Sequence, residues 1–304
     1  MGNGPGGSSS GTRSDPAHLS VVIVTWNTRD YLLAALRSIR ESAVDFRVET
    51  IVVDNASGDG TAEAVASEHP EALLIANADN AGYARGNNQG IAAAAGRMVL
   101  LLNPDVVLPP TALASAVDAL ERRPDVGALG VRLTSPDGSL QRSVRGFPTP
   151  FSVFCEAIGL SRLFPRNRRL ASYRMGWFAY DRECEVDQPM GTFLLIRREA
   201  LEDVGMLDER FPIFFNEVDW CFRARSKGWR ILFSPVADVL HHGGAATRQI
   251  WAEMAWESRR GLLAYYRKHY RAWWFAPIYW VAAGASWVQA CRSAKRRGLE
   301  VGRT

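Results

Sequence analysis

Short apolar runs without polar alternation recur through the first half of the chain, and a helical pattern follows each of them. Such runs are typical of strands that are buried on both faces of a sheet. Strands alternating with helices of this length form βαβ units, whose right-handed crossovers place helices on both faces. The sequence therefore predicts an α/β fold with a Rossmann-like, mostly parallel central sheet. The predicted strands are residues 19–25, 50–53, 72–76, 98–102 and 126–133.

The predicted strand 98–102 ends at the turn Asn103-Pro104-Asp105, which places a carboxylate just beyond the strand. In an open parallel sheet, ligands bind outside the carboxyl ends of the strands, so Asp105 stands where a phosphate or a metal ion would lie. Asn-Pro-Asp is also good turn chemistry, and Asp105 could instead cap a helix that begins near Pro110. Both interpretations are open on this stretch alone.

The turn after the first predicted strand reads Trp26-Asn27-Thr28 and contains no glycine. A dinucleotide-binding enzyme carries G-x-G-x-x-G directly after this strand, and no Walker A motif occurs anywhere in the sequence. A nucleotidyltransferase is expected to show a basic, glycine-rich loop at the same place. These three classes of nucleotide-binding protein are therefore excluded.

The composition is that of a folded protein. Hydrophobic residues make up 47% of the chain and charged residues 22%, and the formal net charge is +4, as in an ordinary globular domain. Residues 1–18 are rich in glycine and serine without an apolar run, so we expect a flexible tail and no signal peptide. The four cysteines form no CxxC pair, which argues against a zinc knuckle or a disulfide framework and fits a reducing compartment.

A second informative stretch leads into a helix predicted over residues 216–227, whose first turn holds Glu217 and Asp219. Two carboxylates in a first turn suit the helix dipole and need no further function. However, a glutamate flanked by Phe215 and Trp220 is partly desolvated, which raises its pKa toward that of a general base.

Two basic motifs are more ambiguous. His241 and His242 follow two short strands predicted over 231–240 and precede two glycines, so they are candidate metal ligands, although such a pair is more often structural. Arg142 and Arg145 lie in the less regular segment 134–190 and could bind a phosphate. A solvated basic strand or turn is the slightly favoured interpretation of this arginine pair.

Taken in order, the motifs of residues 19–245 resemble those of family 2 glycosyltransferases, which have the GT-A fold. Within that family the chain is most similar to bacterial rhamnosyltransferase-type members, which extend surface or cell-wall glycans. The matching elements are VVIVTWN (21–27), VVDNASGDGT (52–61), NAGYARGNNQG (80–90), LLNPD (101–105), MGTFLLIRREAL (190–201), DERFPIFFNEVDWCFRARSKGW (208–229) and HHGG (241–244).

The resemblance implies a nucleotide-sugar donor. Thr25 and Asp54 match the strand ends where the family holds the base and the ribose. A carboxylate there accepts the imide N–H of uracil or thymine, so a UDP- or dTDP-sugar is implied, with L-rhamnose or another hexose as the sugar. The implied donor-side residues are Thr25, Asn27, Asp54, Asn80, Gly82, Asn87 and Asn103.

The resemblance also implies a metal ion. Asp105 matches the last position of the family's DxD element and His241 its other metal-side residue, with Mg²⁺ or Mn²⁺ as the ion. Asn103 replaces the first aspartate of DxD, which removes one negative charge from the site.

Glu217 matches the family's base, which takes the proton of the acceptor hydroxyl in a single inverting displacement. The usual Glu-Asp pair reads Asn216-Glu217 here, and Asp219 is the reserve candidate for the base. Arg142, Arg145 and Trp220 are candidate contacts to the acceptor or its phosphate.

Two other functions compete with this interpretation. Asn103 and Asn216 make a non-catalytic protein that binds nucleotide sugars or glycans on a GT-A fold conceivable. A binding module needs no base, however. The argument against it is the joint presence of Asp54, Asp105, Glu217 and His241. Transfer to a protein or a small soluble acceptor is the second alternative.

The carboxyl-terminal segment predicts contact with a membrane. Residues 250–269 form an amphipathic helical pattern, and residues 272–291 carry no charge between basic flanks. Twenty residues suffice to span a bilayer, but their regularly spaced tryptophans prefer the interface. A helix in the plane of an anionic membrane surface is favoured, with packing on the protein, on a homodimer partner, or across the bilayer as alternatives.

We therefore expect a cytoplasmic enzyme, peripheral to the inner face of the cell membrane, with a glycan or polyprenyl-diphosphate-linked acceptor and no nucleic-acid partner. The predicted divisions are a tail (1–18), a GT-A domain with a nucleotide-sugar half (19–133) and an acceptor half (134–248), and carboxyl-terminal helices (249–304).

Overall fold

The computed structural model describes residues 17–270 and residue 284. The predicted tail therefore lies outside the described residues up to residue 16, as does the predicted helix 272–291 apart from residue 284. His18 already belongs to the fold, because its backbone N–H donates to Arg47 and its ring stacks on Phe46. The prediction that the tail extends to residue 18 is thus wrong by two residues.

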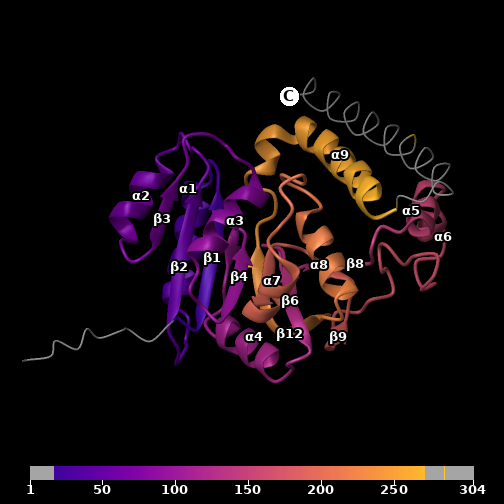
Figure 1. Ribbon diagram of the computed structural model, residues 1–304, viewed down its shortest axis with the longest axis horizontal. Helices are drawn as coiled ribbons and strands as arrows, with labels where there is room; N and C mark the ends of the chain where they lie inside the picture. The colour runs from indigo at the N-terminus through magenta and orange to yellow at the C-terminus, as the bar shows by residue number, and fades with distance from the viewer. Residues whose placement is uncertain (1–16, 271–283, 285–304) are drawn as a thin grey trace, which may run out of the picture.

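The centre of the described structure is one ten-stranded sheet (Figure 1). Eight of its strands follow the order β3-β2-β1-β4-β11-β6-β12-β5, and in addition β7 pairs with β6 and β9 pairs with β12. The first four strands of this order are parallel, as predicted. The strands of the sheet are β1 (Leu19–Thr25), β2 (Val48–Asp54), β3 (Leu73–Ala76), β4 (Met98–Leu102), β5 (Val106–Val107), β6 (Val126–Thr134), β7 (Leu140–Gln141), β9 (Cys184–Glu185), β11 (Phe193–Arg197) and β12 (Arg230–His241); β8 (Val144–Arg145) and β10 (Gln188–Pro189) form a separate pair.

Helices cover both faces of the sheet, so the predicted α/β layering is confirmed. On one face lie α1 (Arg29–Arg40), α2 (Thr61–Glu68) and α4 (Ala112–Glu121), whose apolar sides share a core with β1 and β6. On the other face lie α3 (Tyr83–Ala93), α7 (Arg198–Val204) and α8 (Asn216–Ser226). The remaining helices are α5 (Pro150–Ala157), α6 (Leu160–Leu163), the 3-10 turn η1 (Thr247–Ile250) and α9 (Trp251–His269).

Strand β11 runs antiparallel to both of its neighbours, β4 and β6. Phe193, its first residue, pairs with Leu102, the last residue of β4. The residues just before β11 therefore reach the same sheet edge as the residues just after β4. Strand β12 is continuous, where two short strands were predicted, and its register shifts between Ser234 and Asp238.

Two glycines of the segment 80–90 let α3 lie directly against β1. A methyl group at Gly90 would come 2.3 Å from Cγ1 of Val22, and one at Gly86 would come 2.8 Å from Cγ1 of Val24. Because larger residues would push the helix outward, these glycines fix the position of the loop that precedes α3.

Helix α9 packs on the main body of the protein. Tyr265 is fully buried and shares a small core with Phe211 and Val218, and Gly261 faces the ring of Phe215. The predicted boundary near residue 249 therefore does not separate α9 from the sheet domain. In residues 17–270 no helix is long and apolar enough to cross a bilayer.

Candidate active site

A cavity of about 370 Å³ opens where β1 and β4 end and where β11 begins. Its size lies in the usual range of small-molecule sites. Strand ends, the loop before α3, the start of α8 and the segment leading into α9 all contribute to its wall. The predicted site residues on this wall are Thr25, Asn80, Gly82, Asn103, Asp105, Glu217 and His241.

Asp105 and His241 meet at the wall of this cavity. Nε2 of His241 lies 3.3 Å from Oδ1 of Asp105, and the backbone N–H of Ala245 donates to Oδ2 at 3.1 Å. Burial opposes ionisation of Asp105, but His241 and the Ala245 N–H hold its pKa below the usual value. Asp105 is thus a buried carboxylate rather than the cap of the helix near Pro110, since α4 begins only at Ala112.

Gln141 fixes the orientation of His241. Its Oε1 lies 2.7 Å from Nδ1, and its Nε2 donates to the backbone carbonyl of His241 at 2.7 Å. Since the amide oxygen only accepts, Nδ1 carries a proton and Nε2 is the ring atom left for another partner. Nε2 is buried and makes no hydrogen bond among the described residues.

The Asp105–His241 pair fits a divalent cation. An imidazole nitrogen and a carboxylate oxygen at this separation can share either a proton or a metal ion. No third His, Cys, Asp or Glu joins them in the part of the chain that the structure describes. A cation held by this pair would therefore keep most of its coordination positions for other ligands.

Glu217 lies at the start of α8 and lines the cavity. The chain enters this helix through Phe215, which adopts a left-handed conformation (φ 72°) that is strained for an aromatic residue. Burial raises the pKa of Glu217 to about 7, although the backbone N–H groups of Glu217 and Val218 oppose the shift. A carboxyl group with this pKa changes its protonation state near neutral pH, as a general base requires.

Gly191 and Tyr83 build the surroundings of this carboxyl group. A methyl group at Gly191 would come 3.5 Å from Cβ and Cγ of Glu217. The hydroxyl of Tyr83 donates to the carbonyl of Gly191 at 3.1 Å, and burial raises its pKa above the usual value. Tyr83 therefore stays neutral and fixes the segment against which Glu217 packs.

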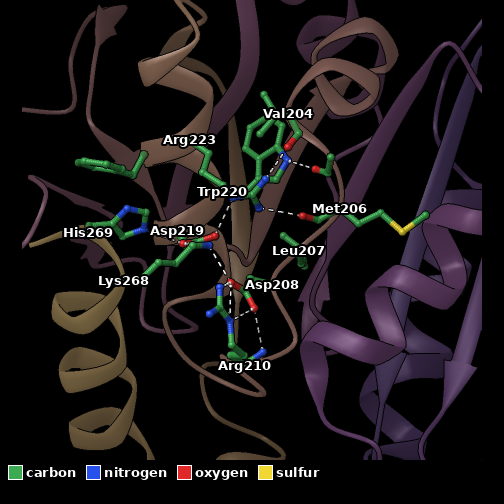
Figure 2. Close-up of polar contacts among 12 residues, drawn as sticks. Val204, Met206, Leu207, Asp208, Arg210, Asp219, Trp220, Arg223, Lys268 and His269 are labelled. Atoms are coloured by element: carbon green, nitrogen blue, oxygen red, sulfur yellow. Dashed lines mark hydrogen bonds and ion pairs between the residues drawn. The ribbon is translucent and has the colours of Figure 1, made fainter. Parts of the chain in front are cut away.

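Asp219 lies outside the cavity, where the structure gives it a different role (Figure 2). Its carboxylate is fully buried and accepts hydrogen bonds from Nε of Arg223 at 2.8 Å and Nε2 of His269 at 2.7 Å. Nζ of Lys268 lies 2.5 Å away. Burial opposes its ionisation, but these three partners hold its pKa below the usual value. The prediction that Asp219 is a reserve base is wrong, because its carboxylate joins α8 to α9.

The same cluster holds the loop between α7 and α8. Lys268 also pairs with Asp208 at 2.7 Å, and Arg223 donates to the carbonyls of Val204 and Met206 at 2.6 and 2.8 Å. Figure 2 shows these contacts converging from α8, α9 and the loop. We call Asp208, Asp219, Arg223, Lys268 and His269 the α8–α9 ion cluster.

Three predicted donor residues do not lie on the cavity wall. Asn27 accepts a hydrogen bond from the backbone N–H of Gly58 and joins two loops. Asp54 lies beside Thr25 in register, but its carboxylate accepts the N–H and hydroxyl of Ser57. Asn87 is fully buried in α3, where it donates to a backbone carbonyl of its own helix.

The predicted acceptor residues are also outside the cavity. Trp220 is a core residue with no exposed surface, and its indole N–H donates to the carbonyl of Gly205 at 2.9 Å. The guanidinium of Arg145 donates to the carbonyls of Arg142 and Val144. A direct contact of Trp220 with an acceptor is thus incorrect. Arg145 lies in β8 and Arg142 is exposed just before that strand, and phosphate binding by this pair stays a prediction.

Sequence reasoning missed several residues of the site. The sequence did not indicate a role for Gln141, because its partner His241 lies 100 positions away in the chain. Asn55 lines the cavity directly after Asp54, and Tyr83 lies inside a segment that was noted only for its motif. Ile250 and Met254 show that the start of α9 belongs to the cavity wall.

The chain is similar in sequence to known glycosyltransferases. A family model described as "Glycosyltransferase like family 2" matches residues 16–276. The N-acetylglucosaminyl-diphospho-decaprenol L-rhamnosyltransferase of Mycobacterium tuberculosis is 31% identical over 279 residues, which cover 88% of this chain and 90% of the relative. A low-salt glycan biosynthesis hexosyltransferase of Haloferax volcanii is 25% identical over 74% of this chain and 67% of its own.

Solved structures show the same fold. A mannosyltransferase of Pyrobaculum calidifontis, solved with GDP-Man and Mn²⁺, matches with a TM-score of 0.56 at 21% identity and covers 93% of this chain and 76% of its own. GalNAc-T7, solved with UDP, GalNAc and Mn²⁺, matches with a TM-score of 0.54 at 15% identity, over 75% of this chain and 44% of its own. With a family match over most of its length and the matching fold, the chain belongs to glycosyltransferase family 2.

Proposed function

We propose that this glycosyltransferase moves a sugar, best assigned as L-rhamnose or another hexose, from a dTDP- or UDP-sugar to a hydroxyl of a lipid-linked glycan. The observation that carries the proposal is that one cavity is lined both by Glu217, with a pKa of about 7, and by the Asp105–His241 pair. The rhamnosyltransferase relative supports the sugar and the polyprenyl-linked acceptor. Cell-wall or surface polysaccharide synthesis at the inner face of the cell membrane is the corresponding role.

The proposed reaction is a single inverting displacement. The acceptor oxygen attacks the anomeric carbon while its proton passes to the carboxylate of Glu217. The bond between that carbon and the diphosphate oxygen breaks at the same time, and its electron pair leaves with the nucleoside diphosphate. Asp105 and Nε2 of His241 would hold Mg²⁺ or Mn²⁺, which when bound supplies charge neutralisation at the diphosphate.

The nucleobase of the donor is proposed to bind at the ends of β1 and β2. Thr25 and Asn55 line the cavity there. Asp54 has lone pairs beyond those that Ser57 uses, which supports recognition of the imide N–H of uracil or thymine. Thermal-shift titration with UDP-, dTDP- and GDP-sugars, with and without Mn²⁺, tests this proposal. Stabilisation by the guanine nucleotide alone would contradict it.

The pH dependence of transfer provides a direct test of the base. Only the ionised form of Glu217 accepts a proton, so with a pKa of about 7 the rate is expected to rise about tenfold per pH unit up to pH 7 and then level off. Initial rates at saturating donor and metal, measured from pH 5 to pH 9, check this profile. A rate that stays constant from pH 5 upward would show that another group takes the proton.

Gln141 is expected to affect metal affinity without touching the metal ion. Replacing it in the variant Gln141→Ala frees Nδ1 of His241 and lets the ring rotate, so Mn²⁺ affinity in the presence of UDP should fall by about 10- to 100-fold. Titration calorimetry measures the change. Leu140→Ala, at the exposed neighbouring position, is the control and should bind Mn²⁺ like the unmodified protein. Equal affinity of the two variants would refute this role of Gln141.

A further inference from the structure

Large apolar side chains lie exposed on α5 and α6, a segment to which the transfer reaction assigns no role. Leu163 exposes 69% of its surface, and Phe151 and Ile158 expose 54% each. Phe151 and Phe154 lie on α5 and Ile158 directly follows it, and their spacing i, i+3, i+7 places them on one side of this helix. We call Phe151, Phe154, Ile158, Leu163 and Phe164 the α5–α6 patch.

The exposed side chains Phe151 and Phe154 lie on α5, which is a regular, capped helix. Thr149 caps α5, since its hydroxyl oxygen accepts the backbone N–H of Ser152 at 3.1 Å, and Pro150 occupies the first turn. Pro150, Ser152 and Cys155 are buried on the side that faces the protein. The helix therefore packs with one side and presents its aromatic side outward. Contiguous apolar surface of this kind marks interaction sites in soluble proteins.

Exposed positive charge lies in and directly after α6. Four exposed arginines follow α5, at positions 162, 166, 168 and 169, and the single acidic residue, Glu156, pairs with Arg174. Four arginines against one glutamate give residues 150–169 a formal charge of +3. This charge is complementary to anionic lipid headgroups. It opposes pairing with a second copy of the same surface, because two clusters of arginines would then face each other.

The position of the segment suits contact with an extended surface. In Figure 1, α5 and α6 lie at one end of the molecule, opposite the end formed by α2 and β3. A patch at an end of the molecule can meet a flat partner without hindrance from the sheet domain.

We propose that the α5–α6 patch docks the enzyme on an anionic lipid bilayer. The apolar side chains enter the boundary between headgroups and acyl chains, and the arginines lie at the level of the lipid phosphates. This inference rests on the proposed function in one respect: a polyprenyl-linked acceptor is presented at a bilayer surface. It assigns the contact to residues 151–169, independently of the segment after residue 270.

Co-sedimentation of the full chain with vesicles tests the inference. The vesicles contain either phosphatidylcholine alone or an equal mixture with phosphatidylglycerol. The variant Phe151→Ser/Phe154→Ser/Ile158→Ser is expected to lower partitioning into the mixed vesicles about 100-fold. The charge variant Arg166→Glu/Arg169→Glu is expected to lower it by at least about tenfold. Binding of the unmodified protein should weaken at 0.5 M salt, since surface electrostatics are screened.

Matched controls come from the other end of the molecule. Leu73→Ser removes a half-exposed apolar side chain of β3, and Arg40→Glu reverses an exposed charge at the end of α1. Both controls should partition like the unmodified protein. Circular dichroism melting shows whether each variant is folded. A patch variant that melts normally and still binds mixed vesicles like the unmodified protein would overturn the inference.

Other occupants of the patch give different results. If a second copy covers it, size-exclusion chromatography will show a dimer that the serine variant dissociates without loss of vesicle binding. If another part of the chain covers it, amide hydrogens of residues 151–164 will be equally protected with and without vesicles. Either result contradicts docking on lipid, whereas new protection by mixed vesicles supports it.

The assay separates this inference from the proposed function. The serine variant should keep its transfer rate on a short-chain, water-soluble polyprenyl-diphosphate acceptor and lose it on a long-chain acceptor in vesicles. Glu217→Gln should differ from it, with normal vesicle binding and a rate of transfer that is about 100- to 10,000-fold lower on both acceptors. If the unmodified protein binds vesicles through the patch but transfers to neither acceptor, the acceptor assignment fails and lipid docking stands.

Discussion

Glu217→Gln is expected to lower the rate of sugar transfer by about 100- to 10,000-fold, the range that a positioned general base contributes. The amide has nearly the shape of the carboxylate but accepts no proton, so the acceptor hydroxyl must then attack without being deprotonated. Nucleotide binding should be unchanged, because Asp105, His241 and Asn55 line other parts of the wall. Initial rates and UDP titration calorimetry measure the two effects separately.

Stability measurements show whether a loss of transfer is caused by misfolding of the variant. Burial raises the pKa of Glu217 to about 7 in the folded protein, so the folded state binds its proton more tightly than the unfolded state. The stability that this proton contributes is complete below the unfolded pKa and is lost as the pH rises through 7. At pH 8 the uncharged Glu217→Gln variant should therefore melt no lower than the unmodified protein. The control Glu202→Gln changes an exposed residue of α7 and should transfer normally; normal transfer by Glu217→Gln itself would exclude the base assignment.

Asp219→Asn is expected to lower the free energy of unfolding by about 3–5 kcal/mol, the usual cost of breaking a buried ion pair by removing one partner. The variant leaves Arg223, Lys268 and His269 without the buried carboxylate that they share. Because Lys268 retains Asp208 as a partner, we expect the loss of unfolding free energy to lie near the lower end of this range. Urea denaturation at pH 7 measures the loss.

The control for this prediction is Asp118→Asn on α4, whose carboxylate pairs with Arg122 on an exposed helix face. Exposed pairs contribute at most about 1 kcal/mol, so its loss should be several times smaller. The pKa of Asp219 is lowered on folding, so its contribution is complete above the unfolded pKa and is lost as the pH falls through the folded pKa. The stability difference between the unmodified protein and Asp219→Asn should therefore disappear in strong acid. Equal destabilisation by both variants at pH 7 would refute the anchoring role of Asp219.

The bounds of β1 and β4 match the prediction because these two strands are buried on both faces. A continuous apolar run leaves little choice of structure, as β1 and β4 show. The direction of a strand, however, cannot be predicted from its burial. Strand β11 has the same apolar pattern as β4 but runs the opposite way, since direction depends on how the chain reaches the sheet and not on which faces are buried.

The candidate site was predictable where a residue lies at or just beyond the end of a strand, or in the first turn of a helix, at the same sheet edge. Asp105, Glu217 and His241 fulfil this condition, and they line one cavity. The prediction that Asp219 is a reserve base is wrong because of the geometry of the helix. Residues two apart on a helix point to nearly opposite sides, so if Glu217 faces the cavity, Asp219 cannot. Asn27 and Asn87 do not lie on the cavity wall because local hydrogen bonds use their side chains, Asn27 between two loops and Asn87 within α3.

The antiparallel β11 has a consequence for how the polypeptide acquires its structure. It lies between β4 and β6, which are near neighbours along the chain, yet it begins only at Phe193. A nascent chain that ends at residue 133 would thus have a gap in the middle of its sheet, with unpaired edges on both sides. We therefore expect that residues 19–133 do not fold on their own, although they contain the donor-side strands. Because the pairs of β11 join residues 91–99 positions apart with β4 and 66–68 positions apart with β6, we expect slow folding that is completed only after β11 has been synthesised.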